Sequence, residues 1–274
     1  TDLGLFVAGG KGETSRQTPA QIEERGDLIS TDPSELVYAS KMVAKVDSAA
    51  LQDGYQLYHH VFIFTRKGSW AVVQQGMNET TRYARRYHWL GETVSDFVCE
   101  PHAAICSEMR GEALNLVAVE STPARGVITN IASEEKPEKT IAELKRIKSL
   151  DLPPRHYMKT EDIHPDRLAK ILVSTYERSP GDFEELLSLP GVGPKTIRAL
   201  SLLSELVYGA PPSFSDPARF GFAHGGKDGI PYPVDRRTYD QSIELLRKAL
   251  SRSKIGLSEK RQAIGRLDDW HFRQ

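Results

Sequence analysis

The stretch Leu189-Pro-Gly-Val-Gly-Pro-Lys-Thr196 decides how the second half of this 274-residue chain folds. A short apolar helix is expected to end at Leu187, a tight turn follows, and Pro194 suits the first position of the next helix. The two glycines of the turn allow a phosphate to approach the backbone closely. Free amides at the start of the second helix, with the positive end of its dipole, would hold that phosphate. The string therefore predicts a helix-hairpin-helix element over residues 183–208.

Such an element positions a nucleic-acid backbone but does not read its sequence. Val192 is expected to pack inward and fix the turn, and Lys195 and Arg198 supply positive charge. The alternative is an ordinary connection between two helices. The residues expected to contact DNA here are Gly191, Val192, Gly193, Lys195, Thr196 and Arg198.

The composition limits where DNA contacts can lie. The net charge is -1, so positive charge must be clustered locally. No apolar run has the roughly 20 residues that a membrane-spanning helix needs, and no signal-peptide pattern precedes the first helix. Cys99 and Cys106 form neither a CxxC motif nor a disulfide framework. We expect a cytoplasmic protein with DNA as its partner and no membrane contact.

Outward from the hairpin, the pattern predicts an α+β protein. A mixed α/β domain is expected over residues 1–150 and a helical domain over 156–274, with a break at Leu152-Pro-Pro-Arg155. The first domain should hold a strand from Leu5, helices from Thr18 and over 34–44, and a hairpin of strands 55–65 and 69–75. We also expect a helix over 79–90 and a strand over 114–120. In the second domain, helices are expected over 162–177, 183–187, 194–208, 236–252 and 258–270.

The first domain carries candidate metal ligands and candidate DNA contacts. Asp47, Asp53, His59 and His60 surround the strand hairpin, and such side chains can bind a divalent ion that activates water. If residues 79–90 are helical, Arg82, Arg85 and Arg86 share one face and are further DNA contacts. Lys11, in the glycine-rich loop 9–12 that precedes Ser15 and Arg16, is another candidate phosphate contact. The alternative for the metal set is solvated or core-packed side chains. For the arginines it is a salt-bridged surface helix, and for Lys11 it is a mobile glycine loop.

The hairpin string resembles that of the helix-hairpin-helix DNA glycosylases. In bifunctional members of that superfamily, the lysine at the position of Lys195 attacks the sugar and forms a Schiff base. An essential aspartate lies downstream in a motif that Pro233-Val-Asp235 resembles. The resemblance implies that Lys195 is the nucleophile and that Asp235 stabilises the positive charge on the sugar.

A second resemblance runs almost from end to end. The strings Val7-Ala-Gly-Gly-Lys-Gly12, 50–60, Gln74-Gln-Gly-Met-Asn78, 83–89 and 222–229 are similar to those of the family called domain of unknown function 763. That family is archaeal and bacterial, and its members usually carry a further N-terminal segment. Its name implies no activity.

Three functions remain open from the sequence. The favoured one is a DNA-repair enzyme that excises a base with Lys195 and Asp235. The second is a metal-dependent nuclease that uses Asp47, Asp53 and the histidines at 59 and 60. The third is a DNA-binding module without catalysis.

Overall fold

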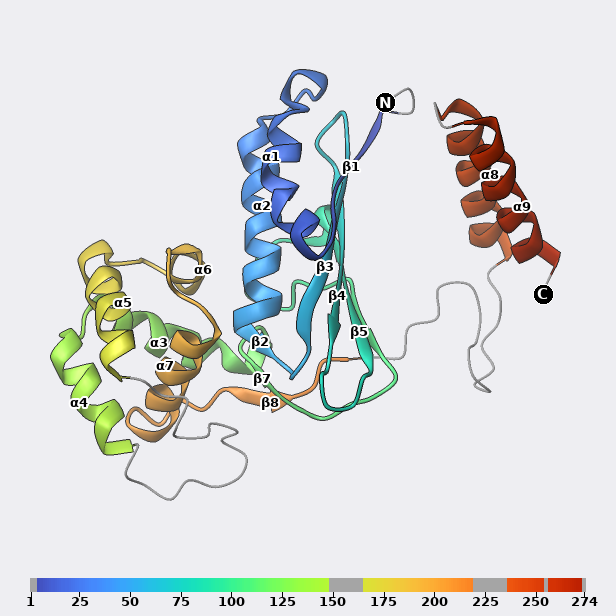
Figure 1. Cartoon of the computed structure of the whole chain (residues 1–274). Helices are drawn as coiled ribbons and strands as arrows, with labels where there is room; N and C mark the ends of the chain where they lie inside the picture. The colour runs from blue at the N-terminus through green and yellow to red at the C-terminus, as the bar shows by residue number, and fades with distance from the viewer. Residues whose placement is uncertain (1–3, 148–164, 219–235, 254–255, 273–274) are drawn as a thin grey trace. The chain divides into compact units, whose positions relative to one another are not determined.

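The computed structural model describes residues 4–147, 165–218, 236–253 and 256–272, and within them the chain is an α+β protein, as expected (Figure 1). It divides into two compact units. One is Phe6–Phe220, and the other joins Thr1–Leu5 to Gly221–Gln274. All the site geometry below lies within the first unit.

Two sheets make up the β structure of the described residues. The larger has the strand order β1-β3-β4-β5-β6, and the smaller has the order β2-β7-β8. The strands are β1 (Leu5–Lys11), β2 (Leu51–Gln52), β3 (Gln56–Thr65), β4 (Trp70–Met77), β5 (Ala84–Leu90), β6 (Ala104–Ser107), β7 (Glu112–Asn115) and β8 (Ser213–Ser215). The pairs from β3 to β6 are antiparallel, so the predicted β3–β4 hairpin is confirmed.

One face of the larger sheet is buried beneath helices α1 (Thr18–Glu23) and α2 (Pro33–Lys45), which lie along it (Figure 1). Period-2 alternation places Phe62, Val72 and Trp89 on this face. The same face also carries polar side chains from neighbouring strands, because His60 pairs with Gln74 and Gln74 pairs with Tyr87. A polar row inside the core must be satisfied by hydrogen bonds, and it forms the start of the site below.

The expected helix over 79–90 is wrong, because residues 84–90 form strand β5 between β4 and β6. Asn78 begins a turn in which its Oδ1 accepts the amides of Thr80 and Thr81. The arginines therefore share no helix face. Arg82 lies in the turn, Arg85 is buried, and Arg86 is exposed on the opposite side of the strand.

The expected strand over 114–120 ends early, at Asn115. The Oδ1 of Asn115 accepts the amides of Val117 and Ala118, and its carbonyl accepts the hydroxyl of Ser121. These bonds turn the backbone into a short 3-10 helix, Val119–Ser121, that leads into helix α3 (Thr122–Ser133).

A group of helices follows in the first unit (Figure 1). They are α3 (Thr122–Ser133), α4 (Pro137–Ile147), α5 (Pro165–Arg178), α6 (Phe183–Ser188) and α7 (Pro194–Leu206). Their core includes Ile128, Leu144 and Leu200. The helical group thus begins at residue 122, and β8 returns from it to pair with β7 in the smaller sheet.

The second unit contains helices α8 (Arg236–Arg252) and α9 (Leu257–Phe272), close to the expected bounds, and the two pack together. The expected break at 152–155, the loop at 223–229 and Asp235 lie outside the described residues. Among the helices described, none has both the length and the apolar character to cross a membrane.

Candidate nucleic-acid interface and its neighbouring pockets

The hairpin between α6 and α7 has the backbone that its sequence predicts. The side chain of Asp182 caps α6 by accepting the amide of Glu185, and Leu189 leaves the helix in an extended conformation. Gly191 has a φ of 84°, a left-handed conformation that favours glycine. Pro194 then occupies the first turn of α7, whose opening amides have no partner within the helix.

The hairpin side chains divide into a buried and an exposed set. Val192 is 1% exposed and Thr196 is 3% exposed, so both fix the turn from inside. Gly191 and Lys195 are exposed, and Gly193 and Arg198 are half-buried. The inward packing of Val192 is confirmed, and the exposed edge of the hairpin includes Pro190, Gly191, Pro194 and Lys195.

Three side-chain contacts tie the hairpin to the end of α2 and to β2. Lys45 donates from its Nζ to the carbonyl of Val192. Gln52 donates from Nε2 to the carbonyl of Pro194 at 2.9 Å and accepts Arg198 Nε on its Oε1 at 2.6 Å. The hairpin is therefore held by the N-terminal part of the chain as well as by its own helices.

A cavity of about 590 Å³, here called the basic pocket, lies beside Lys45. It is lined from the 3-10 helix Gly12–Gln17, from α1 and α2, from β3 and β4, and by Ser188 at the end of α6. Its lining residues that carry or can carry positive charge are Arg16, Lys41, Lys45, His59 and His60, and those described include no Asp or Glu. Because the described side chains that line the pocket include basic ones and no acidic ones, the pocket is suited to an anion. Burial lowers the pKa of Lys45.

A chain of buried hydrogen bonds forms one wall of the basic pocket. Ser40 Oγ lies 3.0 Å from His60 Nε2, and His60 Nδ1 lies 2.8 Å from Gln74 Oε1. Gln74 Nε2 in turn donates to Asp47 Oδ2 and to the carbonyl of Val43. Burial lowers the pKa of His60, which favours the neutral imidazole.

Asp47 is the last residue of this hydrogen-bond chain and lies in the core. It lies in a π-helical segment, Val46–Ala50, that continues α2, and its side chain has no exposed surface. Besides Gln74, it accepts Trp89 Nε1 at 2.9 Å and pairs with His102 Nε2 at 2.5 Å. Both of its carboxylate oxygens are engaged by protein groups.

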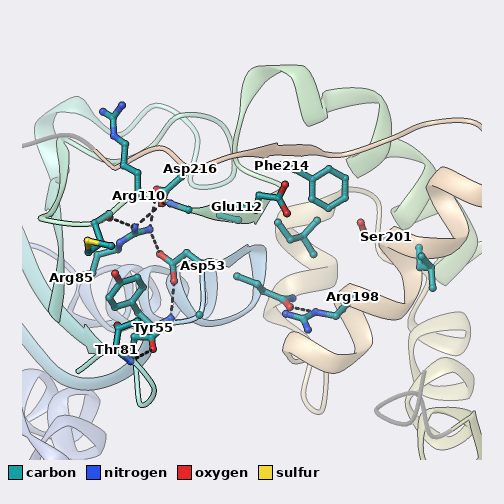
Figure 2. Close-up of a pocket in the computed structure, with 18 of the residues that line it drawn as sticks. Asp53, Tyr55, Thr81, Arg85, Arg110, Glu112, Arg198, Ser201, Phe214 and Asp216 are labelled. Carbon is teal, nitrogen blue, oxygen red and sulfur yellow. Dashed lines mark hydrogen bonds and ion pairs between the residues drawn. The ribbon is translucent and has the colours of Figure 1, made fainter. Parts of the chain in front are cut away.

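A second cavity of about 470 Å³, the ion-pair pocket, lies between β5, the smaller sheet and α7 (Figure 2). Arg85 is 1% exposed and donates to Asp53 at 2.8 Å and to Asp216 at 2.7 Å. Figure 2 shows both carboxylates pointing at this guanidinium, with Arg198 and Ser201 of α7 on the other side. The Tyr55 ring lies 4.4 Å from the guanidinium carbon.

The two aspartates that pair with Arg85 differ in their proton affinity. Burial raises the pKa of Asp53, despite Arg85 and a 2.7 Å hydrogen bond from the Tyr87 hydroxyl. For Asp216, burial is outweighed by hydrogen bonds from Arg85 and from the amides of Ala218 and Gly111, so its pKa is lowered. The arrangement is a buried ion-pair network rather than a set of open ligands.

The predicted metal residues are not brought together around one point. Asp53 belongs to the ion-pair pocket, Asp47 lies in the core, and His59 and His60 line the basic pocket. Within the described part of the chain, no group of three or more His, Cys, Asp or Glu side chains is placed to hold a metal ion.

The remaining predicted DNA contacts lie in different places. Lys11 is exposed, with its Nζ 5.9 Å from the centre of the Tyr58 ring. Arg85 is committed to its ion pairs, whereas Arg82 and Arg86 are exposed. Gly9 gives its amide to Gln21 Oε1, which takes that donor out of the expected phosphate loop.

Sequence reasoning missed Ser40, Lys45, Gln74 and Asp216. Lys45 and Asp216 act through partners more than a hundred residues away, and no local motif marks such pairs. Gln74 could have been noticed, since it is a polar residue at an inward-facing, buried position of strand β4.

The fold and its hairpin define the class: an α+β protein with a helix-hairpin-helix element that two polar pockets adjoin. The chain belongs to the family described as protein of unknown function (DUF763), whose sequence pattern matches residues 1–234. Neither the curated proteins nor the solved structures contain a match to the chain. These comparisons do not support the resemblance to helix-hairpin-helix glycosylases.

Proposed function

We propose that this protein binds DNA by holding the sugar-phosphate backbone at the hairpin Leu189–Thr196. The observation that carries the proposal is the pairing of a left-handed, exposed Gly191 with an exposed Lys195 at the start of the 13-residue helix α7. A phosphate can approach the glycine turn, meet the first amides of α7 and gain the charge of Lys195.

The basic pocket supports the same proposal. Lys45 lines that pocket and also contacts the hairpin backbone, so the two surfaces are adjacent. Arg16 and Lys41 add exposed positive charge there. Local clusters of this kind supply DNA affinity even when the net charge of the chain is close to zero.

Fluorescence anisotropy with a labelled duplex tests the proposal on the full chain. Lys195→Ala should weaken binding equally for unrelated sequences and reduce the slope of log K against log salt by about 1. Gly191→Ala should also weaken binding, because alanine disfavours the left-handed conformation by about 1–2 kcal/mol.

Gly209→Ala is the matched control for Gly191→Ala. Gly209 has a φ of 67° at the end of α7, away from the hairpin turn, so the substitution imposes the same kind of backbone strain. Its affinity should equal that of the wild type. Equal affinities for all three variants and the wild type would contradict the proposal.

Base excision is the second candidate, and it is favoured by the exposure of Lys195 on the hairpin edge. An amine there can reach the sugar of a bound nucleotide and form a Schiff base. Borohydride should then trap a covalent adduct on an abasic-site duplex for the wild type and Lys41→Ala, but not for Lys195→Ala. Absence of an adduct in the wild type would refute this chemistry and leave a binding function.

The metal-dependent nuclease gains no comparable support. The carboxylates of Asp47 and Asp53 are each engaged by buried protein donors, in separate parts of the first unit.

A further inference from the structure

The hydrogen-bond chain at the basic pocket determines which nitrogen of His60 carries the proton. Gln74 donates its amide N–H groups to Asp47 and to the Val43 carbonyl, so its Oε1 must be the atom that faces His60. That oxygen only accepts, and His60 Nδ1 must therefore carry the hydrogen. The unprotonated Nε2 then accepts the hydroxyl hydrogen of Ser40 at 3.0 Å.

A hydroxyl that donates to a neutral imidazole, whose other nitrogen is fixed by an acceptor, is the arrangement of an activated nucleophile and its base. Ser40 and His60 are only 3% and 7% exposed, yet both line the basic pocket. The pair is thus screened from bulk water and reachable from one side.

The charges around the pair indicate the kind of substrate. Lys41 and Lys45 are one turn apart on α2 and line the pocket together with Ser40, and Arg16 contributes from the opposite 3-10 helix. In the hydrogen bonds described, two acidic side chains bond to lining residues: Glu184 accepts the Tyr38 hydroxyl, and the buried Asp47 accepts the Gln74 amide. Positive charge beside a nucleophile stabilises a phosphoryl group in the transition state.

We propose that Ser40 is a nucleophile, that His60 is its general base, and that the substrate is a phosphodiester. The choice of a phosphodiester rests on the proposed DNA binding, whereas the reactivity of Ser40 does not. A bond forms between Ser40 Oγ and phosphorus while one ester P–O bond breaks. His60 Nε2 takes the serine proton and passes it to the leaving alkoxide.

Water completes the cycle. It attacks the phosphorus of the phosphoserine, His60 Nε2 takes one of its protons, and that proton returns to Ser40 Oγ as the P–O bond breaks. No further reactant is needed. Gln74 acts through His60 and is a positioning residue.

Labelling with a fluorophosphonate probe tests the nucleophile without any assumption about the natural substrate. Tandem mass spectrometry should locate the adduct on Ser40 of the full wild-type chain. Ser40→Ala and His60→Asn should each reduce the labelling rate at least tenfold. Ser48→Ala is the matched control, because Ser48 lines the same pocket but is exposed and lacks a histidine partner in the bonds described.

Two labelling outcomes would overturn the proposal: no adduct on the wild type, or an adduct that persists in Ser40→Ala. Thermal melts of each variant show whether it is folded. Peptide mapping of the wild type tests the nucleophile even if one of the variants does not fold.

The substrate class is tested by hydrolysis of bis(p-nitrophenyl) phosphate in EDTA, with p-nitrophenyl acetate alongside. Turnover of the phosphodiester that Ser40→Ala abolishes is the expected result. Turnover of the acetate alone would overturn the phosphodiester assignment. Gly191→Ala separates the two proposals, since it should weaken DNA binding and leave the labelling of Ser40 unchanged.

The role of Gln74 has its own readout. Gln74→Met removes the acceptor of His60 Nδ1–H, a hydrogen bond that raises the pKa of His60, so the midpoint of the pH–labelling curve should fall. The other charged or titratable groups that share the pocket or the hydrogen-bond chain are the same in both proteins: Arg16, Tyr38, Lys41, Lys45, Asp47, Tyr58, His59 and His102. An unchanged midpoint would remove Gln74 from the mechanism.

Discussion

Lys45, near the end of helix α2, donates a hydrogen bond to the backbone carbonyl of Val192 in the hairpin turn, 147 residues later in the chain. The bond joins the sheet-bearing part of the first unit to the element proposed to hold DNA. Because Lys45 also lines the basic pocket, a change at this one side chain reaches both surfaces.

Lys45→Met should lower the free energy of unfolding by about 1–2 kcal/mol, because the Val192 carbonyl loses its donor. DNA affinity should fall as well, because the turn is less firmly held. Urea unfolding and anisotropy measure the two effects. Lys41→Met, a change to an exposed lysine one turn earlier, is the control for lost charge. Identical stabilities for the two variants would show that the bond to Val192 contributes nothing.

Gln52→Leu should loosen the start of α7. Gln52 is the partner of both the Pro194 carbonyl and Arg198, and leucine replaces neither bond. Hydrogen exchange should accelerate at the amides of the first turns of α7 but not in α3. Uniform acceleration across both helices would instead indicate a global loss of stability.

Arg85→Met should be the most damaging change in the ion-pair pocket. It leaves the carboxylates of Asp53 and Asp216 without their shared cation, and breaking a buried pair costs about 3–5 kcal/mol. Arg86→Met, at the exposed neighbouring position of β5, should leave stability within about 0.5 kcal/mol of the wild type. Chemical denaturation that ranks the two variants equally would contradict the ion-pair assignment.

Asp216 should make the protein sensitive to acid. Its pKa is below the ordinary Asp value of 3.8, so the folded state binds the proton less tightly than the unfolded state. The resulting stability is fully present above that ordinary value and is lost as the pH falls through the lower, folded pKa. The free energy of unfolding should therefore differ less between pH 6 and pH 3 in Asp216→Asn than in the wild type.

The control for this pH dependence is Asp27→Asn, since Asp27 is exposed and takes no part in the ion-pair network. It should show the same pH dependence as the wild type in denaturation at each pH. If Asp216→Asn also follows the wild-type curve, the hydrogen bonds to Asp216 do not lower its pKa.

The hairpin could be predicted from sequence because its requirements are local. A glycine with positive φ, an inward valine and a proline at the helix start all lie within eight residues. The β3–β4 hairpin was predictable for the same reason, from alternation and a short turn.

The sequence of strand β5 predicts a helix because the charged Arg85 lies at an inward-facing position, where a strand pattern would have an apolar residue. Arg85, Tyr87 and Trp89 alternate inward, but an arginine in the first of these positions hides the period-2 pattern. The spacing of Arg82, Arg85 and Arg86 also matches one helix face. The partners Asp53 and Asp216 explain why Arg85 is buried, and they lie 32 and 131 residues away in the sequence, where no local pattern marks them.

The carboxamide of Gln74 has one further effect on the core. An amide cannot pass a proton between its oxygen and its nitrogen as an imidazole or a carboxyl group can. The carboxamide of Gln74 therefore blocks proton transfer along the hydrogen bonds that run from Ser40 to Asp47. His60 and Asp47 sense each other's charge through it, but no proton passes between them. Any proton that His60 takes up must leave toward the basic pocket. The buried hydrogen-bond chain therefore exchanges protons at its Ser40 end only.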